Sequence, residues 1–365
     1  MIVDLFAGPR GWSEGLRLLG LADIGLELDT AACRTAHAAG HVTIQCDVTQ
    51  YPTAPFRGRV KGKISSPVCT PFSAAGKQDG ITDLPLVHQA VHDLAHGRDT
   101  RDGIKGACQD AESVLAAEPM RWLYDLRPEW VCMEQVPGVL PLWRQYAGIL
   151  RGWGYSTWTG VLNAADYGVP QTRRRAILIA SRACPVSAPE PTHTENPADG
   201  LFGQRLQPWV TMADALGLPP AVVVNTRGER PKNRRGRAAG GNEFSADGPC
   251  QALTGRARSW KLRSGQGWKL PTGEVDRYER ALGEPSFTIT GSAISCKWVG
   301  DGIEERNLAL EEAAVLQSFR ANRLWHGTRT AQFRQVGNAV PPLLAAHVVS
   351  VATGIPVRQA EEVAA

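Results

Sequence analysis

Short apolar stretches alternate with helical stretches over the first 180 of the chain's 365 residues. The segments 2–6, 24–28 and 42–44 are strand-like, and the segments 12–19 and 30–39 between them suit helices. This βαβ alternation is typical of a parallel sheet covered by helices, because each crossover returns the chain to the same edge. It predicts an α/β fold with a doubly wound, mostly parallel sheet. Further strands are expected at 60–64, 130–133 and 174–180.

Cysteine usage and hydropathy narrow the class of protein. The eight cysteines form no CxxC pair, and the first residues carry no basic, apolar leader. Both observations favour a reducing cytoplasm without disulfides or a zinc cluster. Apolar runs are far shorter than the ~20 residues that a membrane span needs. We therefore expect a soluble, cytoplasmic protein with no metal site and no membrane partner.

Composition changes after Arg182, which divides the chain. Residues 183 to about 300 are rich in Pro, Gly, Arg and Ser with short strand-like pieces, as in a smaller irregular domain. Helical patterns return at 307–319 and 343–351, so the chain is expected to re-enter the first domain. The predicted division is 1–182, 183–302 and 303–365.

Positive charge is concentrated between Asn225 and Arg280. This segment holds thirteen Lys and Arg against six Asp and Glu, although the whole chain is only +4. Interleaved with Trp260 and Trp268, it suits contacts with nucleic-acid phosphates. A solvated basic loop is the alternative.

Cys69 follows the strand at 60–64 in the proline-bracketed run Ser-Pro-Val-Cys-Thr-Pro-Phe-Ser. In open α/β sheets, chemistry gathers at the carboxyl ends of the strands, so Cys69 is a candidate nucleophile. A buried cysteine that only fills space is the alternative.

A glycine-bearing loop, Asp4 to Gly11, ends the first strand and opens a helix. Such a loop brings backbone close to a nucleotide-like ligand, but neither a P-loop nor the GxGxxG spacing is present. Glu27 ends the second strand, where it can accept hydrogen bonds from ribose hydroxyls, and Asp47 follows the third, where it can read an adenine amine. An adenosine cofactor without pyrophosphate, such as S-adenosylmethionine, fits this pattern.

Polar groups also follow the later strands. Glu134 comes after the strand at 130–133, where a carboxylate must hydrogen-bond a partner and suits proton donation. A helix-capping role is the alternative. In the run Gln-Thr-Arg-Arg-Arg at 171–175, strand alternation predicts Arg173 and Arg175 on one face, suited to an anion or a carbonyl.

Six segments together resemble the DNA (cytosine-5)-methyltransferases of bacteria and phages, and they occur in the order found in that family. They are DLFAGPRGW (4–12), SPVCTPFS (66–73), EQV (134–136), QTRRR (171–175), LALEEAAVLQSF (308–319) and QVGNAVPP (335–342). The resemblance spans essentially the whole chain and implies the Rossmann-like fold of S-adenosylmethionine-dependent methyltransferases.

The resemblance also implies a mechanism. Cys69 would add to C6 of a flipped-out cytosine, Glu134 would bind the N3/N4 edge and protonate N3, and Arg175 would hold O2 with support from Arg173. C5 would then take the methyl group, leaving S-adenosylhomocysteine as product.

The same match assigns the other sites. Residues 74 to about 110 would include a loop that closes over duplex DNA, and the basic domain would recognise the target. No obligate protein partner is implied, and we expect a monomer that serves restriction-modification or phage self-protection. The cofactor site would be lined by Phe6, Gly8, Gly11, Glu27, Asp47, Pro67, Asn338 and Val340.

Three departures from the family pattern stand out. Val68 and Thr70 flank Cys69 where Pro and Gln are usual, which is expected to alter the turn. Gln135 replaces the common Asn. Arg10 replaces a glycine and is expected either to pair with the cofactor's carboxylate or to obstruct the loop.

Three alternatives stay open on the sequence. One is the same chemistry on RNA, one is a DNA-binding protein without catalysis, and one is transfer of a group other than methyl. The target sequence is not readable from single residues.

Overall fold

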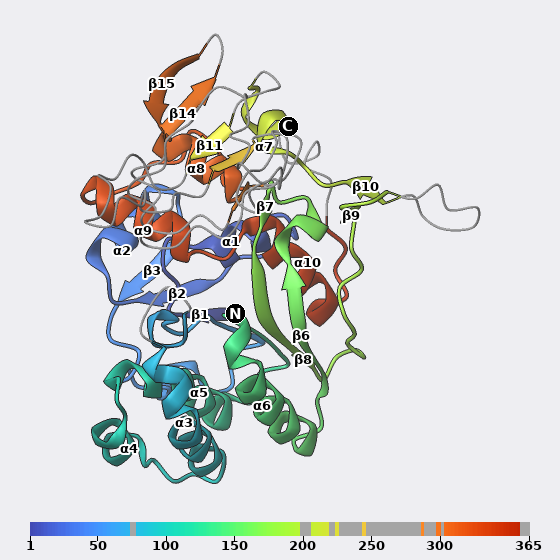
Figure 1. Cartoon of the computed structure of the whole chain (residues 1–365). Helices are drawn as coiled ribbons and strands as arrows, with labels where there is room; N and C mark the ends of the chain where they lie inside the picture. The colour runs from blue at the N-terminus through green and yellow to red at the C-terminus, as the bar shows by residue number, and fades with distance from the viewer. Residues whose placement is uncertain are drawn as a thin grey trace, which may run out of the picture. The chain divides into compact units, whose positions relative to one another are not determined.

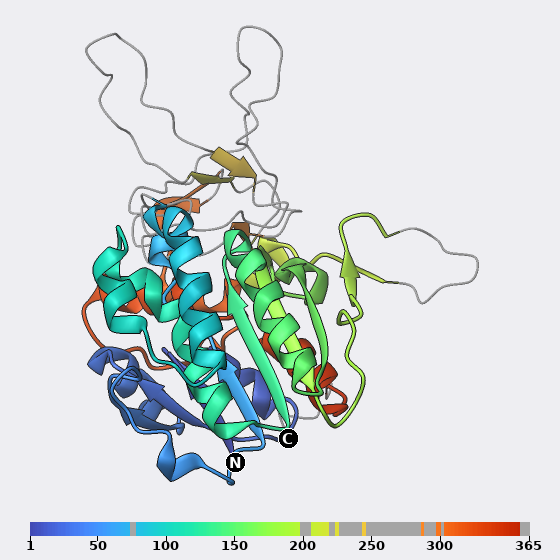
Figure 2. The same cartoon turned by 90° about the horizontal axis from the view of Figure 1, so that it is seen from below.

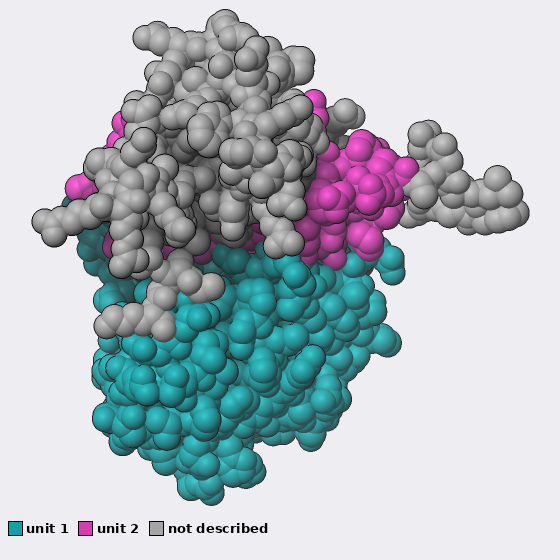
Figure 3. All heavy atoms as spheres, viewed as in Figure 1, with its two compact units in different colours: residues 1–162, 174–190, 344–365 teal, residues 163–173, 191–343 magenta. Residues whose placement is uncertain are grey.

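The computed structural model separates into two compact units, drawn in teal and magenta in Figure 3. Unit 1 comprises residues 1–162, 174–190 and 344–365, and unit 2 comprises residues 163–173 and 191–343. Each unit therefore combines segments that are distant in the sequence. The predicted division of the chain into segments 1–182, 183–302 and 303–365 concerns function, and it stays a prediction. The structure describes residues 1–73, 78–197, 206–218, 223–225, 243–245, 286–287, 297–300 and 303–357.

A seven-stranded sheet forms the centre of unit 1, in the order β3-β2-β1-β4-β5-β8-β6. Neighbouring strands from β3 to β5 are parallel, and β8 runs antiparallel to β5. This arrangement confirms the predicted doubly wound, mostly parallel sheet. The strands are β1 (Ile2–Leu5), β2 (Ile24–Glu27), β3 (Val42–Gln45), β4 (Gly62–Ser65), β5 (Trp130–Gln135), β6 (Ser156–Asn163) and β8 (Arg174–Ser181).

Helices cover the sheet of unit 1. α3, α5 and α6 lie together on one face of it (Figures 1 and 2), where they enclose a core with Val131 and Met133 of β5 and Leu178 of β8. Cys132 and Ile179, which alternate with these residues, are also fully buried, so both faces are covered. The helices are α1 (Gly11–Arg17), α2 (Thr30–Ala38), α3 (Asp79–Ala95), α4 (Arg101–Ala107), α5 (Glu118–Leu126), α6 (Leu140–Gly152) and α10 (Pro342–Thr353).

Unit 2 contains a four-stranded antiparallel sheet in the order β12-β11-β14-β15 and three helices among its described residues. Most of the basic segment 225–280 lies outside the described residues, so its expected contact with nucleic acid stays a prediction. The elements are β7 (Gln171–Thr172), β9 (His193–Thr194), β10 (Gln207–Pro208), α7 (Met212–Leu216), β11 (Val223–Asn225), β12 (Glu243–Ser245), β13 (Ser286–Phe287), β14 (Lys297–Gly300), β15 (Ile303–Asn307), α8 (Leu310–Leu316) and α9 (Arg329–Asn338).

The stretch Arg329–Thr353, which contains α9 and α10, is long and apolar enough to span a membrane. However, 67% of its most apolar window is buried inside the protein. Burial of that extent is typical of a core helix.

Candidate active site

The strand order places the predicted site residues of unit 1 at one edge of the sheet. β2 lies on one side of β1 and β4 lies on the other, so the chain connections diverge between β1 and β4. Ligands of doubly wound folds bind at such a switch point, beyond the carboxyl ends of the strands. The loops that follow β1 and β4 meet there.

The turn that carries Cys69 is held from two directions. Trp12 of α1 donates from Nε1 to Ser66 Oγ over 2.8 Å. Gln135, at the end of β5, donates from Nε2 to the carbonyl oxygens of Pro67 (3.0 Å) and Val68 (3.1 Å). The side chain of Cys69 is partly exposed. The turn therefore presents a thiol from a backbone fixed by side chains of two other segments.

Glu134 lies beside the same turn. β5 continues through Gln135, so Glu134 is a strand residue rather than the residue after a strand, as the sequence suggested. Its Oε1 pairs with Nε of Arg175 at 2.8 Å, and their side chains are 8% and 12% exposed. Glu134 immediately precedes Gln135 in β5, and Gln135 bonds to the residue before Cys69, so the chain positions of the carboxylate and the thiol are linked at this edge.

Glu27 organises the loop that follows β1. Its Oε2 accepts from the amide of Gly8 at 2.7 Å, and its Oε1 accepts from the amides of Leu28 (2.8 Å) and Asp29 (2.7 Å). A carboxylate offers about four acceptor positions, so Oε2 retains one for a ligand hydroxyl. Gly8 has φ +51, and a Cβ there would meet no atom within 4 Å. The backbone is thus open to close approach by a ligand.

Asp47 stands at the start of a tight turn after β3. Its Oδ1 accepts from the amide (2.9 Å) and the hydroxyl (2.7 Å) of Thr49, which orders the turn. The Asp47 side chain is exposed, as is the apolar side chain of Leu28. An open backbone, two carboxylates and an apolar surface fit an adenosine-containing molecule.

Arg10 does not behave as expected. It adopts the left-handed conformation (φ 74), in which glycine is favoured, and its fully buried guanidinium pairs with Asp23 at 2.7 Å. The side chain lies against β2, where a Cβ on Gly25 would come within 1.3 Å of Arg10 Nη1. The expectation that Arg10 reaches the cofactor or obstructs the loop is wrong, because a buried partner holds the guanidinium in the core.

The remaining predicted residues belong to unit 2. Arg173 is buried and donates from Nη1 to the carbonyl of Gly337 at 2.9 Å, so it supports the segment that carries Asn338 and Val340. Asn338 is exposed at the end of α9, whereas Val340 is buried. Strand β8 begins only at Arg174, so the alternation expected to place Arg173 and Arg175 on one face does not extend to Arg173.

The glutamines of unit 2 connect three of the sequence segments. Gln171 donates from Nε2 to Gln317 Oε1 at 2.6 Å, and Gln317 donates to the carbonyl of Ala339, also at 2.6 Å. QTRRR, LALEEAAVLQSF and QVGNAVPP are therefore joined by buried hydrogen bonds.

Sequence reasoning missed the residues that position others. Gln135 was treated as a mild substitution, and Trp12 received no role. Both act over 50 residues or more along the chain, so no local spacing could reveal them. The sequence signal that could have found Trp12 and Gln135 is their position inside the family-like segments 4–12 and 134–136.

Comparison with known proteins agrees with this geometry. The family model of the C-5 cytosine-specific DNA methylases matches residues 101–352. Among curated proteins, the chain is 28% identical to the type II methyltransferase M1.HphI of Haemophilus parahaemolyticus, covering 94% of this chain and 84% of that protein. It is 26% identical to M.DdeI of Desulfomicrobium norvegicum, covering 94% and 86%.

Solved structures share the fold. The Dnmt2 methyltransferase of S. pombe aligns with a TM-score of 0.54 at 13% identity, covering 97% of this chain and 98% of that one. The Entamoeba histolytica methyltransferase EhMeth aligns with a TM-score of 0.53 at 12% identity, covering 97% of each chain. With the family match over more than two thirds of its length, the chain belongs to the C-5 cytosine-specific DNA methylases and is a DNA (cytosine-5)-methyltransferase.

Proposed function

We propose that the protein methylates C5 of a flipped-out cytosine in duplex DNA through a covalent bond between Cys69 and C6. The observation that carries the proposal is the joint placement of the nucleophile turn and Glu134. Gln135 fixes the turn through two carbonyls, while Arg175 fixes the neighbouring carboxylate. An attacking thiol and an acidic group are thereby presented to one substrate.

The first half of the reaction activates the ring. C6 is not accessible within the base stack, so the base must leave the helix at a cost of a few kcal/mol. Cys69, as thiolate, adds to C6, and Glu134 delivers a proton to N3. Arg175 donates to O2 while Glu134 holds its Nε. The ring therefore gains electron density at C5 without an accumulated charge.

The second half restores the ring. S-adenosylmethionine, when bound, supplies the methyl group as an electrophile to C5. Solvent water then accepts the C5 proton, and the electron pair of the C5–H bond restores the C5=C6 double bond as the bond between Cys69 and C6 breaks. Glu134 takes back the N3 proton, so the Cys69 thiolate and the Glu134 carboxylic acid are regenerated.

The cofactor would be held mainly by the loops after β1, β2 and β3. Phe6, Gly8 and Gly11 supply close backbone, Glu27 accepts from the ribose through Oε2, and Asp47 faces the base. Pro67 connects this site to the nucleophile turn. The motif match also proposes Asn338 and Val340 as cofactor-binding residues.

Residues 183–302 would form the target-recognition domain, with residues 1–182 and 303–365 as the catalytic domain. The basic segment would neutralise DNA phosphates. Type II methyltransferases among the relatives favour a restriction-modification role over phage self-protection, for a monomer in the bacterial cytoplasm.

Trapping the covalent bond tests the proposal. Protein, S-adenosylmethionine and a mixed-sequence duplex containing 5-fluorocytosine are incubated, and the intact mass is measured. Fluorine at C5 cannot leave as the proton does, so the adduct should persist in wild type and be absent in Cys69→Ala. A wild type that methylates ordinary duplex DNA without ever forming the adduct would exclude the covalent route.

A further inference from the structure

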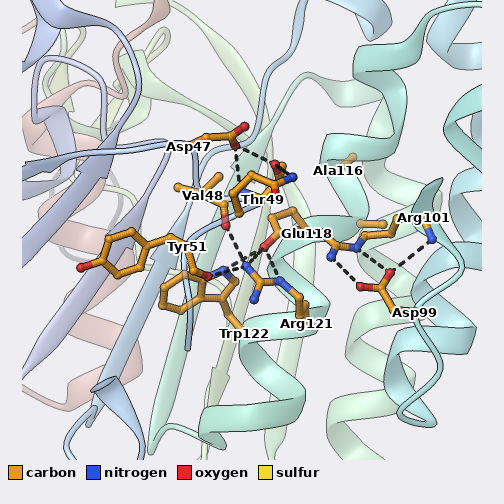
Figure 4. Close-up of polar contacts among 12 residues, drawn as sticks. Asp47, Val48, Thr49, Tyr51, Asp99, Arg101, Ala116, Glu118, Arg121 and Trp122 are labelled. Carbon is orange, nitrogen blue, oxygen red and sulfur yellow. Dashed lines mark hydrogen bonds and ion pairs between the residues drawn. The ribbon is translucent and has the colours of Figure 1, made fainter. Parts of the chain in front are cut away.

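A buried carboxylate, Glu118, lies at the centre of an ionic network at the start of α5 (Figure 4). Its Oε1 accepts from Nε of Arg121 at 2.8 Å and from Nε1 of Trp122 at 2.9 Å. Its Oε2 pairs with Arg101. The Arg101 guanidinium also donates hydrogen bonds to the Asp99 carboxylate from Nε (2.8 Å) and Nη2 (2.6 Å). Two arginines therefore share one carboxylate.

Only one of these arginines continues to the turn after β3. Nη2 of Arg121 donates to the carbonyl oxygens of Val48 at 2.7 Å and Tyr51 at 3.1 Å. Arg101 instead opens α4, which buries no residue, and it makes no contact with the turn among those recorded for the described residues. The two arginines thus share Glu118 but differ in what else they contact.

The turn held by Arg121 is the one that begins at Asp47. Asp47 orders the turn by accepting hydrogen bonds from the amide and hydroxyl of Thr49. Arg121 holds the same turn by donating to the backbone carbonyls of Val48 and Tyr51. Val48 and Trp122 also belong to one apolar cluster, so α5 and the turn are packed as well as hydrogen-bonded.

We propose that Arg121 is a positioning residue for cofactor binding, which it serves by fixing the turn that presents Asp47 to the adenine. Glu118 holds the Arg121 guanidinium in the orientation that reaches both carbonyls. The inference rests on the proposed function, because it takes Asp47 as a cofactor contact. It adds a requirement located on α5, outside the six short motifs that carry the resemblance.

The experiment compares Arg121→Met with Arg101→Met by calorimetric binding of S-adenosylhomocysteine. Both substitutions remove one positive charge from Glu118, but only the first releases the turn. Loss of charge-assisted hydrogen bonds to the turn should raise the Kd of Arg121→Met about tenfold. Arg101→Met should stay within about twofold of wild type, since its contacts lie elsewhere.

A double variant separates positioning from stability. Arg121→Met leaves Glu118 and Asp99 to share the single positive charge of Arg101. Glu118→Gln removes the excess negative charge, so Glu118→Gln/Arg121→Met should recover much of the lost Tm. Its Kd should stay raised, because the turn still lacks its donor. In turnover assays, the KM for S-adenosylmethionine should rise while kcat at saturating cofactor is kept.

Three results would overturn the inference: an unchanged Kd in Arg121→Met, an equal rise in Arg101→Met, or recovery of the Kd together with Tm in the double variant. Failure of the proposed function would look different, because wild type itself would then not bind S-adenosylhomocysteine.

Discussion

Two carboxylate–guanidinium pairs of unit 1 have nearly the same geometry and different surroundings. Glu134 and Arg175 are 2.8 Å apart at the carboxyl edge of the sheet, and both are slightly exposed. Asp23 and Arg10 are 2.7 Å apart and essentially inaccessible. The bond is similar in both, so what each pair can do depends on what lies next to it.

The neighbours of each pair show this. Glu134 is followed in β5 by Gln135, which bonds to the Cys69 turn, the proposed site of the substrate cytosine. The Arg10 pair adjoins Ser13, which donates to Asp23 Oδ2 at 3.0 Å, and the buried carboxylate of Asp4. Burial, and then the negative charge of Asp23, raise the pKa of Asp4 well above its usual value. The raised pKa favours the neutral form of Asp4, so that Arg10 balances the charge of Asp23 alone.

The largest expected effect is on the exposed pair. Glu134→Gln keeps a similar shape but cannot protonate N3, so kcat should fall by about 10²–10⁴-fold. DNA affinity, measured by fluorescence anisotropy, should fall far less. An equal loss in both quantities would contradict the assigned role.

Breaking the buried pair should have the opposite signature. Arg10→Met leaves the Asp23 carboxylate without its counter-ion in the core, which should lower the free energy of unfolding by about 3–5 kcal/mol. The kcat of the folded fraction should stay within about threefold of wild type, because no reacting group is touched. Urea unfolding and single-turnover kinetics measure the two quantities. A variant with full stability and impaired kcat would show that the two pairs are not functionally distinct.

The pH dependence of the protein's stability also distinguishes the buried pair, because Asp4 lies beside it. In the unfolded chain Asp4 loses its proton near pH 3.8, whereas the folded protein retains it to higher pH. Its stabilising contribution is therefore fully present below pH 3.8 and is lost as the pH rises through the folded pKa. Asn cannot titrate, so the Tm of Asp4→Asn relative to wild type should rise with pH.

Thermal unfolding of both proteins across pH 5–9 measures this trend, with the exposed Asp102→Asn as control. A Tm difference that does not change with pH would argue against a neutral, buried Asp4.

The smallest effect is expected at Gln135. Gln135→Ala removes both hydrogen bonds to the Cys69 turn and should lower kcat about tenfold by misplacing the thiol. Gln135→Asn is one methylene shorter and should lose less. The adduct-forming rate with 5-fluorocytosine DNA reports the step directly. Equal rates in all three proteins would mean that other contacts fix the turn.

Much of the fold was predictable because its signals are local. Apolar periodicity located β1, β2, β3 and β8 to within one or two residues, since a strand's side-chain pattern is written in consecutive positions. The helix expected at 307–319 is shorter in the structure, where β15 extends to Asn307 and α8 ends at Leu316. Element ends depend on capping and tertiary contacts that periodicity does not contain.

The candidate site divides in the same way. The sequence by itself determined the family of the chain, and its strand ends and motif order predict Cys69, Glu134 and Arg175 as the groups that carry the chemistry. Only the tertiary structure decided which groups meet. Arg10 pairs with Asp23, Arg173 bonds to Gly337, and Arg121 reaches Val48 and Tyr51. The physical reason is that residue type fixes what a side chain can bind, whereas the order and packing of strands fix what lies within its reach.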